Sequence, residues 1–173
     1  MKRLISLVIL ITTSHIQAQQ RTLPAWFTQS FKQNKLNDKY ELKSYLKPAF
    51  LEADFNGDGI NDIAAIVIEK KTRKGGILLI HGNTNQWFVF GAGTNFGNGS
   101  TDFFNWMKRW KVYCNKVVEE TTFDKNDDIT GSRVLKLKRP GIEVLMLEAI
   151  DEPSPVAVIY WNGKKYIWIH EGE

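Results

Sequence analysis

The sequence is short of cysteine, of long apolar runs and of excess charge, and each shortage excludes a class of protein. Cys114 is the only cysteine in 173 residues, so an internal disulfide framework is excluded. The apolar run at residues 4–11 is far shorter than the roughly 20 residues that a membrane-spanning helix needs. The formal net charge of +4 is too small to indicate a nucleic-acid partner.

The N-terminus has the pattern of a secretory signal peptide. Lys2 and Arg3 form a basic start, residues 4–11 form an apolar core, and small or polar residues lead to Ala18. We expect cleavage after Ala18, where no nearby cysteine could carry a lipid anchor. Removal of residues 1–18 takes two basic residues and no acidic one, which lowers the net charge from +4 to +2. The sequence thus predicts a soluble protein, exported to the periplasm or beyond the cell.

The remaining residues, 19–173, are enough for one domain. Hydrophobic residues make up 43% of the chain and aromatic residues 12%, which is ample for a core. Residues 22–34 have apolar positions at helical spacing, with Thr22 as a possible cap and Pro24 in the first turn. Later segments alternate or form short apolar runs, and Asn162-Gly163 favours a two-residue hairpin turn. We expect a single compact α+β domain, with one N-terminal helix and eight to nine short, mainly antiparallel strands.

The stretch "ADFNGDGINDIAAIVIEKK" contains the strongest candidate site. Counted from Asp54, oxygen-bearing side chains occupy positions 1, 3, 5 and 9, which are Asp54, Asn56, Asp58 and Asp62. Position 6 is a glycine that permits a sharp turn, and position 7 is Ile60, whose backbone carbonyl is a further oxygen. Calcium prefers six to eight hard oxygen ligands, which alternate residues of a tight loop can supply. The simpler alternative is a turn, because Asn, Gly and Asp also suit turns.

The loop does not fit an EF-hand, since position 12 is Ala65, where that motif has a bidentate glutamate, and the flanking segments are strand-like. A loop between strands instead resembles the calcium loops of FG-GAP and VCBS repeats, found in integrin α-chains. The resemblance covers some fifteen residues, and it implies a metal site formed by Asp54, Asn56, Asp58, Asp62 and the carbonyl of Ile60. The motif occurs once here, so a full propeller is not expected.

Other candidate sites carry weaker patterns. Residues 124–131, "DKNDDITG", have oxygen side chains at positions 1, 3 and 5 but Ile129 in place of the glycine, and we interpret them as a hairpin loop. The glycine-rich segment 91–102 lacks both the dinucleotide and the P-loop spacing, although a long loop of this kind can line a site. Trp161, beside the hairpin turn, is the aromatic residue expected to be most exposed. Cys114 is expected to be buried and unreactive.

The order of the N-terminal helix and of the stretches at residues 45–82, 89–113 and 157–173 also resembles a group of small exported bacterial proteins of unknown function. This resemblance implies one compact domain and no established activity. It covers most of residues 19–173. Our leading hypothesis is a non-catalytic exported domain with one structural calcium ion, which binds a protein or glycan at the cell envelope. The alternatives are a hydrolase of envelope or dietary polymers and a periplasmic hydrolase inhibitor. An enzyme would have a pocket with a perturbed acid or histidine near segment 91–102.

Overall fold

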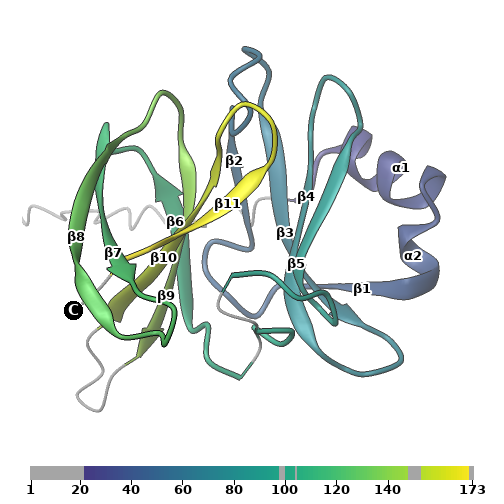
Figure 1. Ribbon diagram of the computed structural model, residues 1–173. Helices are drawn as coiled ribbons and strands as arrows, with labels where there is room; N and C mark the ends of the chain where they lie inside the picture. Colours follow the sequence, from purple (N-terminus) through teal and green to yellow (C-terminus); the bar gives the residue numbers. More distant parts are fainter. Residues whose placement is uncertain (1–21, 98–99, 104, 148–152, 172–173) are drawn as a thin grey trace, which may run out of the picture.

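A computed structural model of the chain describes residues 22–97, 100–103, 105–147 and 153–171 (Figure 1). The predicted signal peptide at residues 1–18 lies outside these ranges. Two short helices precede eleven strands, in the order α1 (Ala25–Gln33), α2 (Leu36–Lys39), β1 (Tyr40–Lys43), β2 (Phe50–Ala53), β3 (Asp62–Glu69), β4 (Gly75–Ile80), β5 (Trp87–Gly91), β6 (Arg109–Tyr113), β7 (Val117–Phe123), β8 (Ile129–Lys136), β9 (Gly141–Leu147), β10 (Pro153–Trp161) and β11 (Tyr166–His170).

The strands form two larger sheets and a separate hairpin, and all of their pairings are antiparallel. The first sheet has the order β1-β3-β4-β5, and β2 also pairs with β3. Strands β1 and β2 lie end to end along one edge of β3, because β1 pairs with residues 66–69 and β2 with residues 62–65. The second sheet has the order β11-β10-β9-β6, and β7 and β8 form a two-stranded sheet. The β-rich antiparallel prediction is confirmed, with more strands than expected.

The layers follow from the burial of apolar side chains on both faces of each sheet. The two sheets face one another, with the helices outside the first and the β7–β8 hairpin outside the second (Figure 1). Ile66, Ile77 and Trp110 belong to the core between the sheets. Phe27 of α1 packs in a second cluster on the other face of the first sheet, with Val67. Strand β3 is buried throughout because both of its faces are covered, and its residues 63–68 are all apolar.

The N-terminal helix differs from the prediction in its cap. Helix α1 begins at Ala25 with Pro24 as the N-cap residue, and no side chain makes a capping hydrogen bond. The predicted cap by Thr22 is therefore wrong, since that residue lies two positions before the N-cap residue Pro24. The Thr28 hydroxyl instead donates to the carbonyl of Pro24, at 3.2 Å. Helix α2 follows Lys35, which has a left-handed backbone conformation, and leads directly into β1.

Candidate functional site

The acidic loop is the connection of the β2–β3 hairpin. Strand β2 ends at Ala53 and β3 begins at Asp62, and these two residues face one another in the register of the pair. The loop therefore has a strand on each side, as the sequence predicted. Gly57 and Gly59 have positive φ values of 81° and 89°, a conformation that other residues rarely adopt. These two glycines give the loop its tight curvature.

Three side chains of the loop converge on its own backbone. The carboxylate of Asp54 accepts the N–H groups of Gly57, Asp58 and Gly59, at 2.7, 3.0 and 2.9 Å. The side-chain oxygen of Asn56 accepts the same Asp58 N–H, at 2.9 Å. The Asp58 carboxylate accepts the N–H of Ile60 and the side-chain amide of Asn56, both at 2.9 Å. Positions 1, 3 and 5 thus place their oxygens around one short stretch of chain.

Asp62, at position 9, is a buried anchor of the loop. Its side chain is completely buried, and one oxygen accepts the N–H groups of Phe55 and Asn56, at 2.9 and 3.1 Å. The other oxygen accepts the N–H of Gly82, at 3.0 Å, which joins the loop to the β4–β5 connection. Burial raises the pKa of Asp62 to about 6, although the three N–H donors act in the opposite direction.

A positively charged side chain from a distant part of the chain contacts the backbone of the loop. Arg139, in the connection between β8 and β9, donates from its Nη1 to the carbonyl oxygen of Asn56. A Cβ atom on Gly57 would lie 3.1 Å from the guanidinium, so the glycine also permits this close approach. The sequence does not reveal this contact, because 83 residues separate the two partners. Arg139 thus brings one positive charge to a loop that holds three carboxylates.

A buried histidine lies close to the same loop. His81 follows β4, and its Nε2 is 2.8 Å from the hydroxyl of Tyr166 on β11. Burial lowers the pKa of His81, while the charges of Asp58 and Asp54 raise it. The ring of His81 also contacts Phe88 and Trp161, with centroid distances of 5.0 and 5.6 Å. His81 is therefore a core residue that hydrogen-bonds across the two sheets, and it lies at the acidic loop and not at segment 91–102.

The oxygens that could hold a cation are those of the loop itself. Within the described residues, no group of three or more His, Cys, Asp or Glu side chains is gathered as a metal centre. The three carboxylates of the predicted set, Asp54, Asp58 and Asp62, are therefore not gathered in this way, and Asn56 and the carbonyl of Ile60 would have to contribute neutral oxygens. Each carboxylate oxygen can accept more than one bond, so an oxygen that accepts an N–H group keeps capacity for a cation. The side chain of Ile60 is 49% exposed and does not cover the loop.

Within the described residues, the two weaker motifs are structural parts of the fold. Asp124 accepts the N–H groups of Asn126 and Asp128, at 2.7 and 3.1 Å, in the turn between β7 and β8. This agrees with the interpretation of residues 124–131 as a hairpin loop. In segment 91–102, Gly97 has positive φ and lies so close to Trp168 that a Cβ atom would be 2.5 Å from the indole ring. Asp102 accepts the N–H of Gly75, at 2.8 Å.

Two predictions about exposure are wrong. Cys114 is exposed, because β6 ends at the buried Tyr113 and the cysteine lies in the connection to β7. Trp161 is only partly exposed, since it packs on the core between the sheets and contacts the rings of Phe88 and Tyr166. Trp87, at the start of β5, is exposed at 43%. The alternation of apolar and polar residues around Cys114 and Trp161 did not reveal where β6 ends or which side chains cover Trp161.

The exposure of Cys114 leads to a direct prediction. We expect a thiol reagent such as DTNB to label one cysteine per chain in native buffer, at a rate close to that of the unfolded protein, because the thiol meets solvent without any opening of the fold. The release of the chromophore with and without denaturant measures both rates. A native rate slower by more than about a hundredfold would contradict the prediction, since it would require local unfolding.

Comparison of the chain with protein-family models, with curated proteins and with solved structures finds no match. The resemblance of the loop to FG-GAP and VCBS repeats therefore stays a prediction. Neither helix within the described residues is long and apolar enough to cross a membrane.

Proposed function

We propose that this protein is an exported, non-catalytic binding domain in which loop 54–62 holds one structural calcium ion. The observation that carries the proposal is the convergence of Asp54 and Asn56 on a single N–H group, that of Asp58. Oxygens that share one donor lie close together, and Asp58 itself adds a third oxygen-bearing side chain to the group. Such a set of hard oxygens on one tight loop suits calcium better than softer metals.

Electrostatics also favours a cation at the loop. The nine residues 54–62 contain three carboxylates, and Arg139, which contacts the loop backbone, contributes one positive charge. A calcium ion held by Asp54, Asn56, Asp58, Asp62 and the carbonyl of Ile60 would reduce the remaining repulsion between carboxylates. In this role the ion fixes the loop and thereby the register of β2 against β3. It supplies no step of a reaction.

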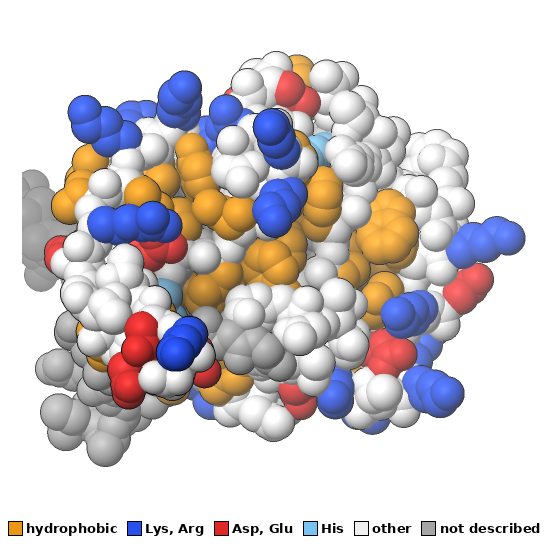
Figure 2. All heavy atoms as spheres, viewed as in Figure 1, with side chains coloured by type: hydrophobic (Ala, Val, Ile, Leu, Met, Phe, Trp, Pro, Cys, Tyr) orange, Lys and Arg blue, Asp and Glu red, His pale blue; other side chains and the backbone are white. Residues whose placement is uncertain are grey.

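The proposed binding role rests on exposed apolar side chains. Figure 2 shows hydrophobic side chains at the surface over the β7–β8 hairpin and in the middle of the same face, with Lys and Arg side chains between them. On the hairpin, Val117, Phe123, Ile129 and Val134 are all exposed, and Val134 is 66% exposed. Exposed apolar side chains that are gathered on one element indicate an interaction site, whereas singly scattered ones need no such explanation. This supports a protein partner at the cell envelope more than a glycan.

The proposed calcium site is tested by thermal unfolding. Extracellular calcium modules have dissociation constants of about 10⁻⁴ to 10⁻³ M. At roughly 2 mM free calcium, such a site stabilises the folded state by about 0.6 to 1.8 kcal/mol. For a domain of this size we expect the melting temperature to rise by roughly 2 to 6 °C. Chelator should reverse the rise, and magnesium should substitute poorly because it requires a smaller octahedral site.

Two variants make the test specific. Asp58→Ala removes a carboxylate of the loop and should abolish the response to calcium. Without calcium, the loss of the hydrogen bonds from Ile60 and Asn56 is offset in part by weaker repulsion between the remaining carboxylates. Asp128→Ala removes a carboxylate from the β7–β8 turn and should leave the response intact. If the wild-type protein melts at one temperature in calcium and in chelator, loop 54–62 is only a turn and the proposal is wrong.

A further inference from the structure

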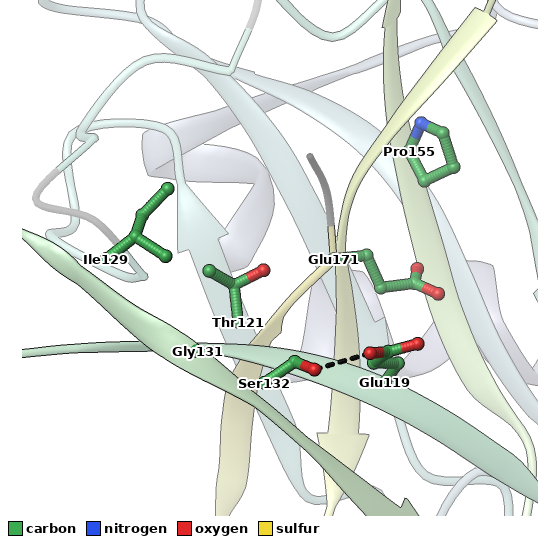
Figure 3. A pocket seen from close by; sticks show the side chains of 7 residues that line it. All are labelled: Glu119, Thr121, Ile129, Gly131, Ser132, Pro155 and Glu171. Carbon is green, nitrogen blue, oxygen red and sulfur yellow. Dashed lines mark hydrogen bonds between the residues drawn. The ribbon is translucent and has the colours of Figure 1, made fainter.

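A hollow between the β7–β8 hairpin and the second sheet is separate from loop 54–62, because none of the residues given below as its lining belongs to that loop. Its volume is about 530 Å³, which is within the usual range for small-ligand sites. The hairpin packs on the sheet near its base, where Val118 and Tyr160 belong to one apolar cluster, and near its tip, where Phe123 contacts the ring of His170. The hollow opens between these two contacts. Its lining residues, drawn in Figure 3, are Glu119, Thr121, Ile129, Gly131, Ser132, Pro155 and Glu171.

Two carboxylates face this hollow. Glu171, directly after β11, has an oxygen, Oε2, that is buried and has no hydrogen-bond partner among the described residues. Glu119, on β7, accepts a hydrogen bond from the hydroxyl of Ser132 with one oxygen. Figure 3 shows both side chains extending into the same part of the hollow. A buried carboxylate oxygen without a donor costs stability, and such an atom calls for an explanation in any folded protein.

The positively charged side chains that the structure describes near the hollow do not donate a hydrogen bond to Oε2 of Glu171. Among the described residues that line the hollow there is no Lys or Arg. Lys111, on β6, forms an ion pair with the buried Glu143, with 2.7 Å between its Nζ and Oε2 of Glu143. Burial raises the pKa of Glu171, and the charge of Lys111 and the hydroxyl of Tyr113 act in the opposite direction. The local balance of the lining residues is therefore negative, with one carboxylate oxygen left without a donor.

We propose that the hollow binds an organic cation, an alkylammonium or guanidinium group whose N–H donors reach the carboxylates of Glu119 and Glu171. The aliphatic chain of such a ligand would lie on Ile129 and Pro155, which form the apolar part of the wall. A free polyamine and a Lys or Arg side chain of another protein both carry this chemistry. The inference goes beyond the proposed function, because it assigns a second site and does not depend on calcium.

The test is a titration of the isotope-labelled protein, followed by amide NMR in chelator and again in calcium. Spermidine serves as the free polyamine, and acetylated, amidated Lys-Arg dipeptide as the protein-derived cation. The same dipeptide with a neutral norleucine-citrulline pair is the uncharged control. We expect saturable shifts at residues around the hollow, with no dependence on calcium, for at least one of the cationic probes. Spermidine alone, the dipeptide alone or both identify the source of the cation.

Matched variants locate the site. Glu171→Gln and Glu119→Gln keep the shape of the side chain and should weaken binding about tenfold or more, the usual effect of a lost charge-assisted hydrogen bond. Asp127→Asn removes the same charge from the turn of the same hairpin, at a residue that does not line the hollow, and should change the affinity less than about twofold. Shifts mapped on the wild-type protein keep the test valid if a variant unfolds. Absence of saturable shifts at about 10 mM of both cationic probes, equal binding of the uncharged control, or equal losses in all three variants would overturn the proposal.

Discussion

Gly76→Ala is expected to destabilise the fold by more than about 4 kcal/mol, a large part of the stability of an ordinary domain. Gly76 lies on β4 opposite Gly91 of β5. An added Cβ atom would be 2.2 Å from the carbonyl oxygen of Phe90 and 2.5 Å from the backbone nitrogen of Ala92. Both atoms belong to the backbone, so no side-chain rotation can relieve the overlap. The end of β5, the edge strand of the first sheet, would have to separate from β4.

The measurement is chemical or thermal unfolding of Gly76→Ala beside Gly163→Ala. Gly163 has a φ of +101°, and a Cβ atom there would meet nothing within 4 Å. This control carries the cost of a left-handed backbone alone, roughly 1 to 2 kcal/mol. A Gly76→Ala protein as stable as the Gly163→Ala control would show that the strands do not approach so closely.

The second large effect is a pH-dependent difference between the wild type and Asp62→Asn. The pKa of Asp62 is raised from 3.8 to about 6 in the folded protein, so the native state binds this proton more tightly than the unfolded chain does. By linkage, the contribution of Asp62 to the free energy of unfolding must increase as the pH falls from 7 towards 4. The shift corresponds to about 2 to 3 kcal/mol over this interval. Asparagine does not titrate, so the variant lacks this contribution.

The experiment is urea unfolding of both proteins in chelator, at several values between pH 4 and pH 7. Asp58 and Glu69 act in the opposite sense, because hydrogen bonds lower their pKa values, but both residues are common to the two proteins. The difference in free energy of unfolding between the two proteins therefore isolates Asp62. A difference that stays constant with pH, or that favours the variant increasingly as the pH falls, would contradict the prediction.

The fold class could be predicted because the apolar pattern of the core strands is strong. Strands β3 and β4 have apolar residues on both faces and form short buried runs in the sequence, and the terminal segment forms a hairpin of β10 and β11 as expected. The hairpin turn itself differs from the predicted two-residue type. The side chain of Asn162 accepts the N–H groups of Lys164 and Lys165, at 2.9 and 3.0 Å, which gives a loop of four residues.

The partners of the candidate sites could not be predicted, because they come from distant parts of the chain. The spacing of Asp54, Asn56 and Asp58 reveals their convergence, since local hydrogen bonds produce it. The contact of Arg139 with this loop depends on how two sheets pack. Glu119 and Glu171 meet at one hollow only because the β7–β8 hairpin lies on the outer face of the second sheet. The polar sequence of β7 gives no period that marks this packing.

The support of loop 54–62 from outside its own hairpin has a consequence for the order of folding. Hydrogen bonds within the loop join residues close in sequence and can form as soon as β2 meets β3. The donors from Gly82 and Arg139 reach it only after the β4–β5 connection is in place and the second sheet has docked. Contacts of such long sequence separation form late, because the chain between them must first be closed. The final shape of the loop is thus a product of the whole chain, and its completion coincides with the completion of the domain.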